Sequence, residues 1–309
     1  MKHLISIHDL DKNQINQIIE EANQYLSSHN GLIANRSLLK NCTVANLFFE
    51  PSTRTRASFE LAAKRMGAHV INLDVNSSAR KKGESILDTI YTLEAMDVDI
   101  FVIRDAGVGV PELIAGHLTK GAVINAGEAN KSHPTQALLD LMTILQLRDN
   151  LENLKISIVG DIIHSRVAAS DYEIFKMYGA FEIRFVGPKE LLPTQAPEGV
   201  LLFDNLEDGI FDADVVMALR IQKERFTQTS AIPDEQTYAQ MFGLNKKSIK
   251  AAKKNALIMH PGPMNRGIEI DSDVADSSQS IICKQVSNGV AIRMALLNQL
   301  FSSLNSNVT

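Results

Sequence analysis

Short apolar runs alternate with helical stretches along the chain, and this alternation constrains the fold more than any other feature. The apolar run 44–49, for example, precedes a stretch of helical spacing at 58–66 that ends at Gly67. Strands that alternate with helices form parallel sheets whose two faces are covered by helices. The alternation restarts at Lys155, after a strongly periodic segment at 135–147. The sequence therefore predicts an α/β chain of two parallel-sheet domains.

The same periodicity predicts the individual elements. The predicted strands are 44–49, 70–73, 100–103, 123–125, 155–159, 183–186, 200–203, 215–218 and 256–259. The predicted helices are 11–26 (with Asp11 as its N-cap), 58–66, 85–96, 111–118, 135–147, one that ends near 178, 206–211, 234–242, 246–254 and 290–304.

The composition excludes some classes of function. The 309-residue chain is 45% hydrophobic with a net charge of -5, so no global charge would attract nucleic acid or an anionic membrane. No apolar run approaches the ~20 residues of a membrane span, and the N-terminus lacks the pattern of a secretory signal. Cys42 and Cys283 lack metal-binding spacing and are expected to be buried, reduced thiols. We expect a soluble, cytoplasmic protein.

Basic and hydroxyl side chains follow the predicted strand at 44–49. Ser52, Thr53, Arg54 and Thr55 stand in succession where the next helix begins. A helix N-terminus presents unpaired N–H groups, and hydroxyls and a guanidinium fork add donors suited to a phosphate dianion. The alternative is an ordinary Ser/Thr helix cap with solvent-facing arginines. The density of donors favours a phosphate site that needs no metal.

Polar residues also follow other predicted strands of the first half. Arg104 is either an anion ligand or a surface arginine whose stem covers apolar surface. His133 and Gln136 stand where the long helix begins, and the histidine either polarises a ligand carbonyl or caps the helix. The basic loop 77–85 either delivers a charge to a site or is simply solvated.

The second half of the chain repeats this arrangement. Arg166, Arg220, Gln222 and the segment 260–267 each follow a predicted strand. The prolines and glycines of 260–267 require a fixed loop. The turn at Gly160 lacks the G-x-G-x-x-G pattern, so a nucleotide-dependent dehydrogenase is not favoured. Arginines gathered at strand ends of both domains, in an acidic protein, predict a multiply anionic ligand in a cleft shared by the domains.

These motifs together resemble the aspartate and ornithine carbamoyltransferase family. The segment 49–56, Phe-Glu-Pro-Ser-Thr-Arg-Thr-Arg, looks like the carbamoyl-phosphate signature of that family, and His133-Pro134-Thr135-Gln136 is similar to its second signature. Further motifs follow in order over essentially the whole chain: Lys81-Lys82-Gly83-Glu84, Gly160-Asp161, Ser165-Arg166, Leu219-Arg220-Ile221-Gln222 and His260-Pro261-Gly262-Pro263.

Two positions depart from the family pattern. Gly127-Glu128-Ala129 stands where the family usually has Gly-Asp-Gly, and Asp105 follows Arg104 where histidine is common. Neither departure removes a donor of the expected site.

The resemblance favours the aspartate branch of the family. The ornithine enzymes carry a His-Cys-Leu-Pro motif where this chain has 260–263, and neither Cys42 nor Cys283 fits that position. Arg220-Ile221-Gln222 looks like the aspartate-specific loop, whose cations would repel the ammonium group of ornithine. The resemblance implies carbamoyl transfer from carbamoyl phosphate to L-aspartate, in pyrimidine biosynthesis. A carbamoyltransferase with another acceptor such as ornithine, and an inactive structural homologue, are the alternatives.

The resemblance also implies domains and partners. It implies a carbamoyl-phosphate-binding domain at 1–134, to which a C-terminal helix at 289–309 returns, and an aspartate-binding domain at 135–288, with the active site in the cleft between them. It implies a homotrimer with shared active sites, and leaves open a larger assembly with regulatory or dihydroorotase-type chains. Arginines and helix N–H groups can neutralise the phosphate, so no metal or organic cofactor is expected.

The residues of the site are likewise implied by the resemblance. The expected catalytic residues are Arg54, Thr55, Arg104, His133 and Gln136. Carbamoyl phosphate is expected to contact these residues and Ser52, Thr53, Gly262 and Pro263. Aspartate is expected to contact Arg166, Arg220 and Gln222, together with Ser78 and Lys82 of a neighbouring subunit.

Overall fold

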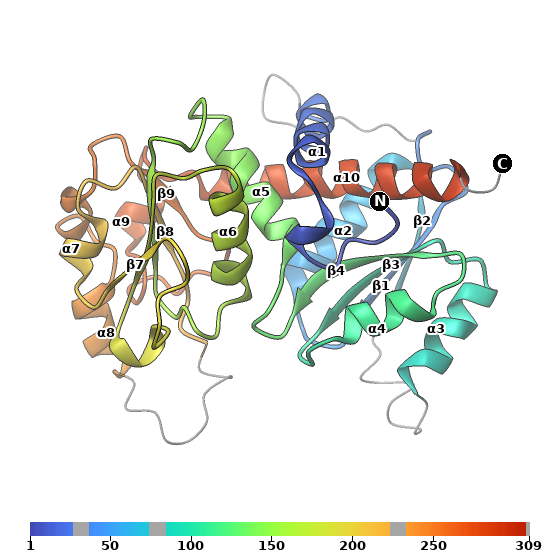
Figure 1. Cartoon of the computed structure of the whole chain (residues 1–309), viewed down its shortest axis with the longest axis horizontal. Helices are drawn as coiled ribbons and strands as arrows, with labels where there is room; N and C mark the ends of the chain where they lie inside the picture. The colour runs from blue at the N-terminus through green and yellow to red at the C-terminus, as the bar shows by residue number, and fades with distance from the viewer. Residues whose placement is uncertain (27–36, 74–84, 223–232, 307–309) are drawn as a thin grey trace. The chain divides into compact units, whose positions relative to one another are not determined.

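The structure, a computed structural model, describes residues 1–26, 37–73, 85–222 and 233–306. The chain divides into two compact units: unit 1 is Met1–Leu139 with Ser287–Thr309, and unit 2 is Asp140–Val286. The division falls inside two helices, α5 (Pro134–Leu145) and α10 (Ile282–Ser306) (Figure 1). Each unit has its own parallel sheet, so the predicted pair of parallel α/β sheets is confirmed.

Unit 1 is built on a sheet with the strand order β2-β1-β3-β4. Its strands are β1 (Thr43–Phe48), β2 (His69–Leu73), β3 (Ile100–Asp105) and β4 (Ala122–Glu128). β1 pairs in parallel with both β2 and β3, and β3 pairs in parallel with β4. Nearly every residue of β1, β3 and β4 is buried, as expected for strands that are covered on both faces.

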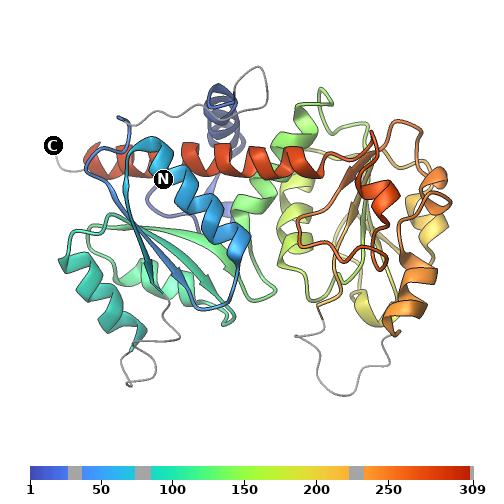
Figure 2. The same ribbon diagram turned by 180° about the vertical axis from the view of Figure 1, so that it is seen from behind.

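Helices cover both faces of the unit 1 sheet (Figures 1 and 2). α3 (Ile86–Ala95) and α4 (Val110–His117) lie on one face, and α2 (Thr53–Met66) and the unit 1 part of α10 lie on the other. The core under α3 and α4 uses alternate strand residues, namely Ala45, Leu47, Phe101 and Ile103. In the part of the chain that the structure describes, no helix has the length and apolar character needed to cross a membrane.

Local sequence signals set the ends of these helices. After η1 (Ile7–Asp9), α1 (Lys12–Gln24) begins at Asp11, whose Oδ1 accepts from the Gln14 N–H at 2.9 Å. The Asp11 N–H donates to Gln14 Oε1 at 3.0 Å, so the two residues form a reciprocal cap. α2 ends at Gly67, whose φ of 90° lies in the left-handed region that glycine adopts most easily.

Unit 2 is built on a sheet with the strand order β7-β6-β5-β8-β9. Its strands are β5 (Lys155–Val159), β6 (Glu182–Val186), β7 (Val200–Phe203), β8 (Val215–Ala218) and β9 (Leu257–Met259). Its helical segments, besides parts of α5 and α10, are α6 (Arg166–Met177), η3 (Lys189–Leu191), α7 (Leu206–Ile210), α8 (Glu235–Phe242), η5 (Ser248–Ala251) and α9 (Ser272–Ala275). One buried cluster packs β8 against α8 through Val216, Tyr238 and Phe242.

The differences between the predicted and observed elements are local. α10 begins at Ile282, about two turns before the predicted start, because Gln285 is a buried polar residue that interrupts the apolar pattern. The prediction of a helix at 246–254 was wrong, because the structure has only the short 3-10 helix η5 there. The Asn245 side chain accepts from the backbone N–H groups of Lys247 and Ser248 and folds the segment into a turn. The short α9 was not predicted.

The cysteine prediction was right for one residue and wrong for the other. Cys42 is buried, whereas Cys283 is exposed on α10. Its neighbours Ile282 and Gln285 occupy the inward face of that helix, with exposures of 7% and 2%, so Cys283 lies on the outer face.

Candidate active site

The predicted site residues of unit 1 follow adjacent strands of one sheet. The chain runs from β1 outward to β2 and then returns to β3 on the other side of β1, so the topological switch lies between β1 and β3. Ligands of parallel α/β sheets bind beyond the carboxyl ends of the strands at such a switch. Ser52 to Thr55 follow β1 at this edge, and Arg104 lies near the carboxyl end of β3.

The first turn of α2 carries the phosphate-type donors. α2 begins at Thr53, and Ser52 occupies the extended N-cap position. Within the described residues the Ser52 hydroxyl makes no capping hydrogen bond, so helix capping alone does not account for this serine. Thr53 and Arg54 are exposed, while Ser52 and Thr55 are half-buried. This turn therefore offers hydroxyls, a guanidinium and helix N–H groups close together.

Arg104 connects the ends of three segments of unit 1. Its Nη2 donates to Glu50 Oε1 at 3.3 Å, just before the α2 turn, and its Nη1 donates to the Ala126 carbonyl of β4 at 3.2 Å. The Phe49 N–H donates to the Arg104 carbonyl at 2.8 Å. The side chain is only 12% exposed. Arg104 is thus not a surface arginine with a solvated head, but a cation held at the sheet edge.

His133 and Gln136 lie at the start of α5. The His133 carbonyl accepts from the Gln136 N–H at 3.0 Å, and both side chains are buried, at 5% and 7% exposure. Between them, Thr135 Oγ1 accepts from Nη2 of the buried Arg293 at 3.4 Å. Arg293 Nη1 also donates to Ser58 Oγ of α2 at 2.8 Å. Arg293 of α10 therefore contacts both α2 and α5, and most candidate residues of unit 1 lie at the starts of these two helices.

The departures from the family pattern have structural partners. Glu128 is 1% exposed, and its Oε1 accepts from the Gly109 N–H at 2.6 Å. Asp105 Oδ1 accepts from the Gly107 N–H at 2.6 Å. Both bonds order the loop that follows β3, and the bond from Gly109 joins that loop to the end of β4. Ala129 has a φ of 43°, in the left-handed region, where the glycine of the family pattern would fit with less strain.

The predicted site residues of unit 2 also follow adjacent strands at a switch. The chain passes from β5 to β6 and β7 on one side, and then to β8 and β9 on the other. Arg166 begins the helix after β5, while Arg220 and Gln222 follow β8, and the segment 260–263 follows β9. The two sheets thus carry their candidate residues at equivalent points of their topologies.

A buried carboxylate ties the segments after β5 and β8 together. Asp161 is 0% exposed; its Oδ2 accepts from the Gln222 N–H at 3.0 Å, and its Oδ1 lies 2.8 Å from His164 Nδ1. Gln222 Nε2 donates to the His164 carbonyl at 2.8 Å. The close approach needs Gly160, since a Cβ there would lie 2.4 Å from the Leu219 carbonyl oxygen. Gln222 is therefore held in one orientation.

The remaining candidate residues of unit 2 differ in burial. Arg166 is 5% exposed, and Arg220 is half-buried with its Nη1 donating to the Ile221 carbonyl at 3.2 Å. Gly262 is half-buried with a φ of 72°, and it joins the exposed Pro263 through a cis peptide bond.

Within each unit the structure brings the predicted residues to one sheet edge. In unit 1 these are Ser52, Thr53, Arg54, Thr55, Arg104, His133 and Gln136, and in unit 2 they are Arg166, Arg220, Gln222, Gly262 and Pro263. Ser78 and Lys82 lie outside the described residues. Sequence reasoning missed the roles of Glu50 and Asp161. Glu50 directly follows one predicted strand and Asp161 lies two residues after another, and that position was the available signal.

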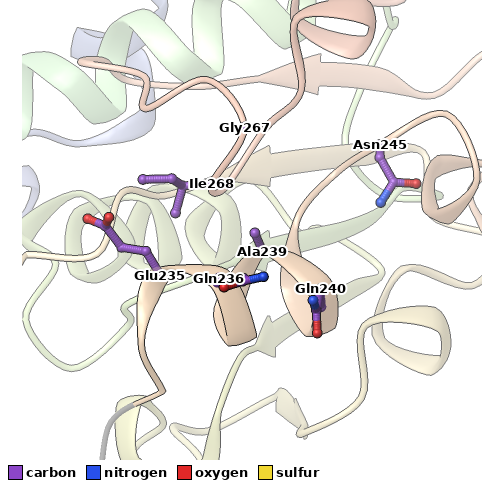
Figure 3. A pocket seen from close by; sticks show the side chains of 7 residues that line it. All are labelled: Glu235, Gln236, Ala239, Gln240, Asn245, Gly267 and Ile268. Atoms are coloured by element: carbon purple, nitrogen blue, oxygen red, sulfur yellow. The ribbon is translucent and has the colours of Figure 1, made fainter.

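A pocket of unit 2 lies apart from these residues. Its volume is about 470 Å³, and Figure 3 shows the side chains that surround it. None of the predicted site residues lines it, so its size alone does not make it the candidate site. The lining residues are Glu235, Gln236, Ala239, Gln240, Asn245, Gly267 and Ile268.

Two family models match the chain in succession. The model described as the carbamoyl-P binding domain of aspartate/ornithine carbamoyltransferase matches residues 2–146. The model described as the Asp/Orn binding domain of the same family matches residues 152–300.

Individual proteins are similar over nearly their whole length. The aspartate carbamoyltransferase catalytic subunit of Vesicomyosocius okutanii is 47% identical over 299 residues, which cover 96% of this chain and 93% of that protein. The catalytic subunit of M. jannaschii aspartate transcarbamoylase has a TM-score of 0.83 at 36% identity, over 98% of this chain and 99% of that one. Trypanosoma cruzi aspartate transcarbamoylase, solved with carbamoyl phosphate and aspartate, has a TM-score of 0.83 at 28% identity, over 97% and 96%.

Proposed function

Because this chain belongs to the aspartate/ornithine carbamoyltransferase family, we propose that it carbamoylates L-aspartate. The donor is carbamoyl phosphate, and the products are N-carbamoyl-L-aspartate and phosphate. We assign this reaction to pyrimidine biosynthesis. The acceptor assignment is supported by the 47% identity to an aspartate enzyme and by the absence of cysteine from the 260–263 segment.

The arrangement of Arg104 carries the proposal. A cation that is 12% exposed lies between Glu50 and Ala126, beside the helix turn that bears Ser52 to Thr55. Such a set suits an acyl phosphate, in which the phosphate is bound and the adjacent carbonyl must be polarised. In our proposal Ser52, Thr53, Arg54 and Thr55 hold the phosphate.

The reaction forms one bond and breaks another at the carbamoyl carbon. The neutral α-amine of aspartate attacks this carbon, and a tetrahedral intermediate forms. Arg104, His133 and Thr55 donate to the developing oxyanion, and each donor of this kind is worth roughly 3–4 kcal/mol. Gln136 helps to orient the carbamoyl group. The C–O bond to phosphate then breaks, and the leaving phosphate takes the amine proton.

The aspartate carboxylates are assigned to unit 2. Arg166 and Arg220 supply cations, and Gln222 supplies an amide that Asp161 and His164 hold in place. Carbonyl groups of the 261–262 segment accept from the carbamoyl NH₂. In this proposal 1–134 with 289–309 is the carbamoyl-phosphate-binding domain, and 135–288 is the aspartate-binding domain, which also contributes Gln136 and the 261–262 carbonyls to the carbamoyl group.

An assay with labelled carbamoyl phosphate tests the proposed function. Aspartate and ornithine are supplied in parallel as acceptors, and labelled carbamoyl-aspartate is the expected product. Labelled citrulline instead would make ornithine the acceptor, and no transfer to either would contradict the proposed activity.

We further propose that the active form is a cytoplasmic homotrimer in which Ser78 and Lys82 of a neighbouring subunit complete each site. Arg54→Ala and Lys82→Ala chains would each be inactive as homotrimers. After subunit exchange, a mixed trimer contains sites with both groups intact, so activity should reappear. A mixture of Arg54→Ala and Arg104→Ala is the matched control, because both groups come from one chain. Equal activity of the two mixtures would contradict shared sites.

A further inference from the structure

His260 is a buried histidine directly after β9, and the proposed mechanism does not use it. Its side chain is 0% exposed. Its Nδ1 lies 2.8 Å from the Gly262 backbone nitrogen, and its Nε2 lies 3.1 Å from Glu269 Oε1. The imidazole thus contacts the backbone of the very segment assigned to the carbamoyl group.

These contacts fix the tautomer of His260. The Gly262 N–H is a donor, so Nδ1 must present its lone pair to it. The ring proton is then on Nε2, where it donates to the Glu269 carboxylate. A proton on Nδ1 would face another N–H group and break the contact with Gly262.

The contact with Gly262 also sets the direction of a carbonyl. The Pro261 carbonyl and the Gly262 N–H belong to one planar trans peptide, so they point in opposite directions. Since the N–H points to the buried imidazole, the Pro261 oxygen is directed away from it. A rotation of this peptide would lose the hydrogen bond and redirect the oxygen.

Other buried groups hold the imidazole itself. Glu269 is 1% exposed and also accepts from the Asn265 N–H. Gln285, at 2% exposure, accepts from the His260 backbone N–H at 2.9 Å and donates through Nε2 to Asp140 Oδ1 at 2.6 Å. The ring therefore has a fixed position from which it can order the loop.

We propose that His260 is a positioning residue that aims the Pro261 carbonyl at the carbamoyl NH₂ group. The proposal rests on the proposed carbamoyl transfer, and it adds the group that controls the loop. A merely structural histidine would stabilise the fold through the same contacts, but it would not distinguish its two ring nitrogens in catalysis.

Two amide substitutions separate the ring nitrogens. In His260→Asn the side-chain oxygen lies near the former Nδ1, so it can still accept from Gly262. In His260→Gln the amide lies near the former Nε2, so it can still donate to Glu269 but no longer reaches Gly262. Each variant keeps one of the two contacts, and thermal unfolding should show comparable losses of stability.

The kinetics should differ between the variants. His260→Gln is expected to lose about 10- to 100-fold in kcat/KM for carbamoyl phosphate, mainly in kcat, because the loop carbonyl is misplaced. His260→Asn should restore most of that loss, to within about threefold of the unsubstituted chain, because it keeps the hydrogen bond from the Gly262 N–H. Equal kinetic losses in the two folded variants would overturn the proposal, as would full activity of His260→Gln.

A measurement on Gly262 tests the contact without reference to catalysis. The sequence contains a single Pro-Gly dipeptide, Pro261-Gly262, so ¹³C-carbonyl proline with ¹⁵N-glycine labelling gives one correlated NMR signal. Exchange of this amide proton should be slow in the unsubstituted chain and in His260→Asn, and roughly tenfold faster in His260→Gln. Unchanged exchange in His260→Gln overturns the role of the imidazole. Absence of carbamoyl-aspartate from the unsubstituted chain would instead refute the proposed function and leave the Gly262 result interpretable.

Discussion

Arg104 Nη2 lies 3.3 Å from Glu50 Oε1, so the cation at the end of β3 is paired with the carboxylate that precedes the α2 turn. Glu50 is 24% exposed at its side chain, and Arg104 only 12%. The pairing holds the guanidinium near the turn that bears Ser52 to Thr55. An entering phosphate would compete with Glu50 for the same fork of donors.

Arg104→Ala should lower kcat/KM for carbamoyl phosphate by about 10²- to 10³-fold, the usual effect of removing one donor to a developing oxyanion. Arg104→Lys keeps the charge but not the planar fork, so it should recover only part of the activity. Steady-state kinetics with saturating aspartate measure both. An alanine variant within twofold of the unsubstituted chain would exclude Arg104 from the site.

Arg54→Ala should abolish most turnover while leaving the fold intact. The side chain is exposed, so its removal should change the free energy of unfolding by no more than about 0.5 kcal/mol. The matched variant is Arg56→Ala, which removes another exposed arginine of the same helix and should remain active. Activity assays and urea unfolding check both variants. Near-full activity of Arg54→Ala would contradict the phosphate assignment.

Arg220→Ala and Asp161→Ala should both weaken the binding of aspartate, for different reasons. Loss of Arg220 removes a proposed carboxylate ligand, and loss of Asp161 releases the Gln222 backbone that it holds at 3.0 Å. The KM for aspartate should rise about tenfold or more, as expected for hydrogen bonds to charged groups. The KM for carbamoyl phosphate should change much less. Equal changes in both KM values would argue against a separate aspartate subsite.

Ala129→Gly should stabilise the protein by about 0.5–1 kcal/mol. Ala129 has a φ of 43°, and relief of left-handed strain outweighs the added flexibility of glycine in the unfolded chain. Ala115→Gly in α4 is the matched control and should cost about 1 kcal/mol, since glycine disfavours a helix. Urea unfolding measures the two free energies, and destabilisation by Ala129→Gly would refute the strain.

Asp171 should make the stability of the protein depend on pH. Burial, and then the charge of Asp140, raise the pKa of Asp171 well above its ordinary value. Such a group binds its proton more tightly in the folded state than in the unfolded state. The stabilisation that this bound proton gives to the folded state is therefore complete below the unfolded pKa of about 3.9. It decreases by about 1.4 kcal/mol per pH unit as the pH rises towards the folded pKa.

Asp171→Asn removes this titration, so its stability relative to the unsubstituted chain should increase as the pH rises from about 5 to 8. Asp140→Asn removes the facing charge, which lowers the pKa of Asp171 and should reduce the pH dependence without abolishing it. Thermal unfolding at several pH values measures these differences. If the difference in stability between Asp171→Asn and the unsubstituted chain did not change with pH, a protonated Asp171 would be excluded.

Much of the fold follows from local patterns of the sequence. The apolar runs predicted most strands of both sheets, and β5 at 155–159 agrees residue for residue. The α10 start was missed because its first turns bury polar side chains such as Gln285, whose partner Asp140 is distant in sequence. The segment at 246–254 failed because the side chain of Asn245 competes with helical backbone bonds.

The sequence by itself determined the α/β class and the chemistry of the strand ends, because hydrophobic periodicity and helix-start signals depend on neighbouring residues. Only the tertiary structure decided which ends are adjacent and which groups hold them. The contacts of Arg104 with Glu50, of Asp161 with Gln222 and of Gln285 with His260 join residues far apart along the chain. Strand order and helix packing create these contacts, and neither is encoded in the spacing of any single motif.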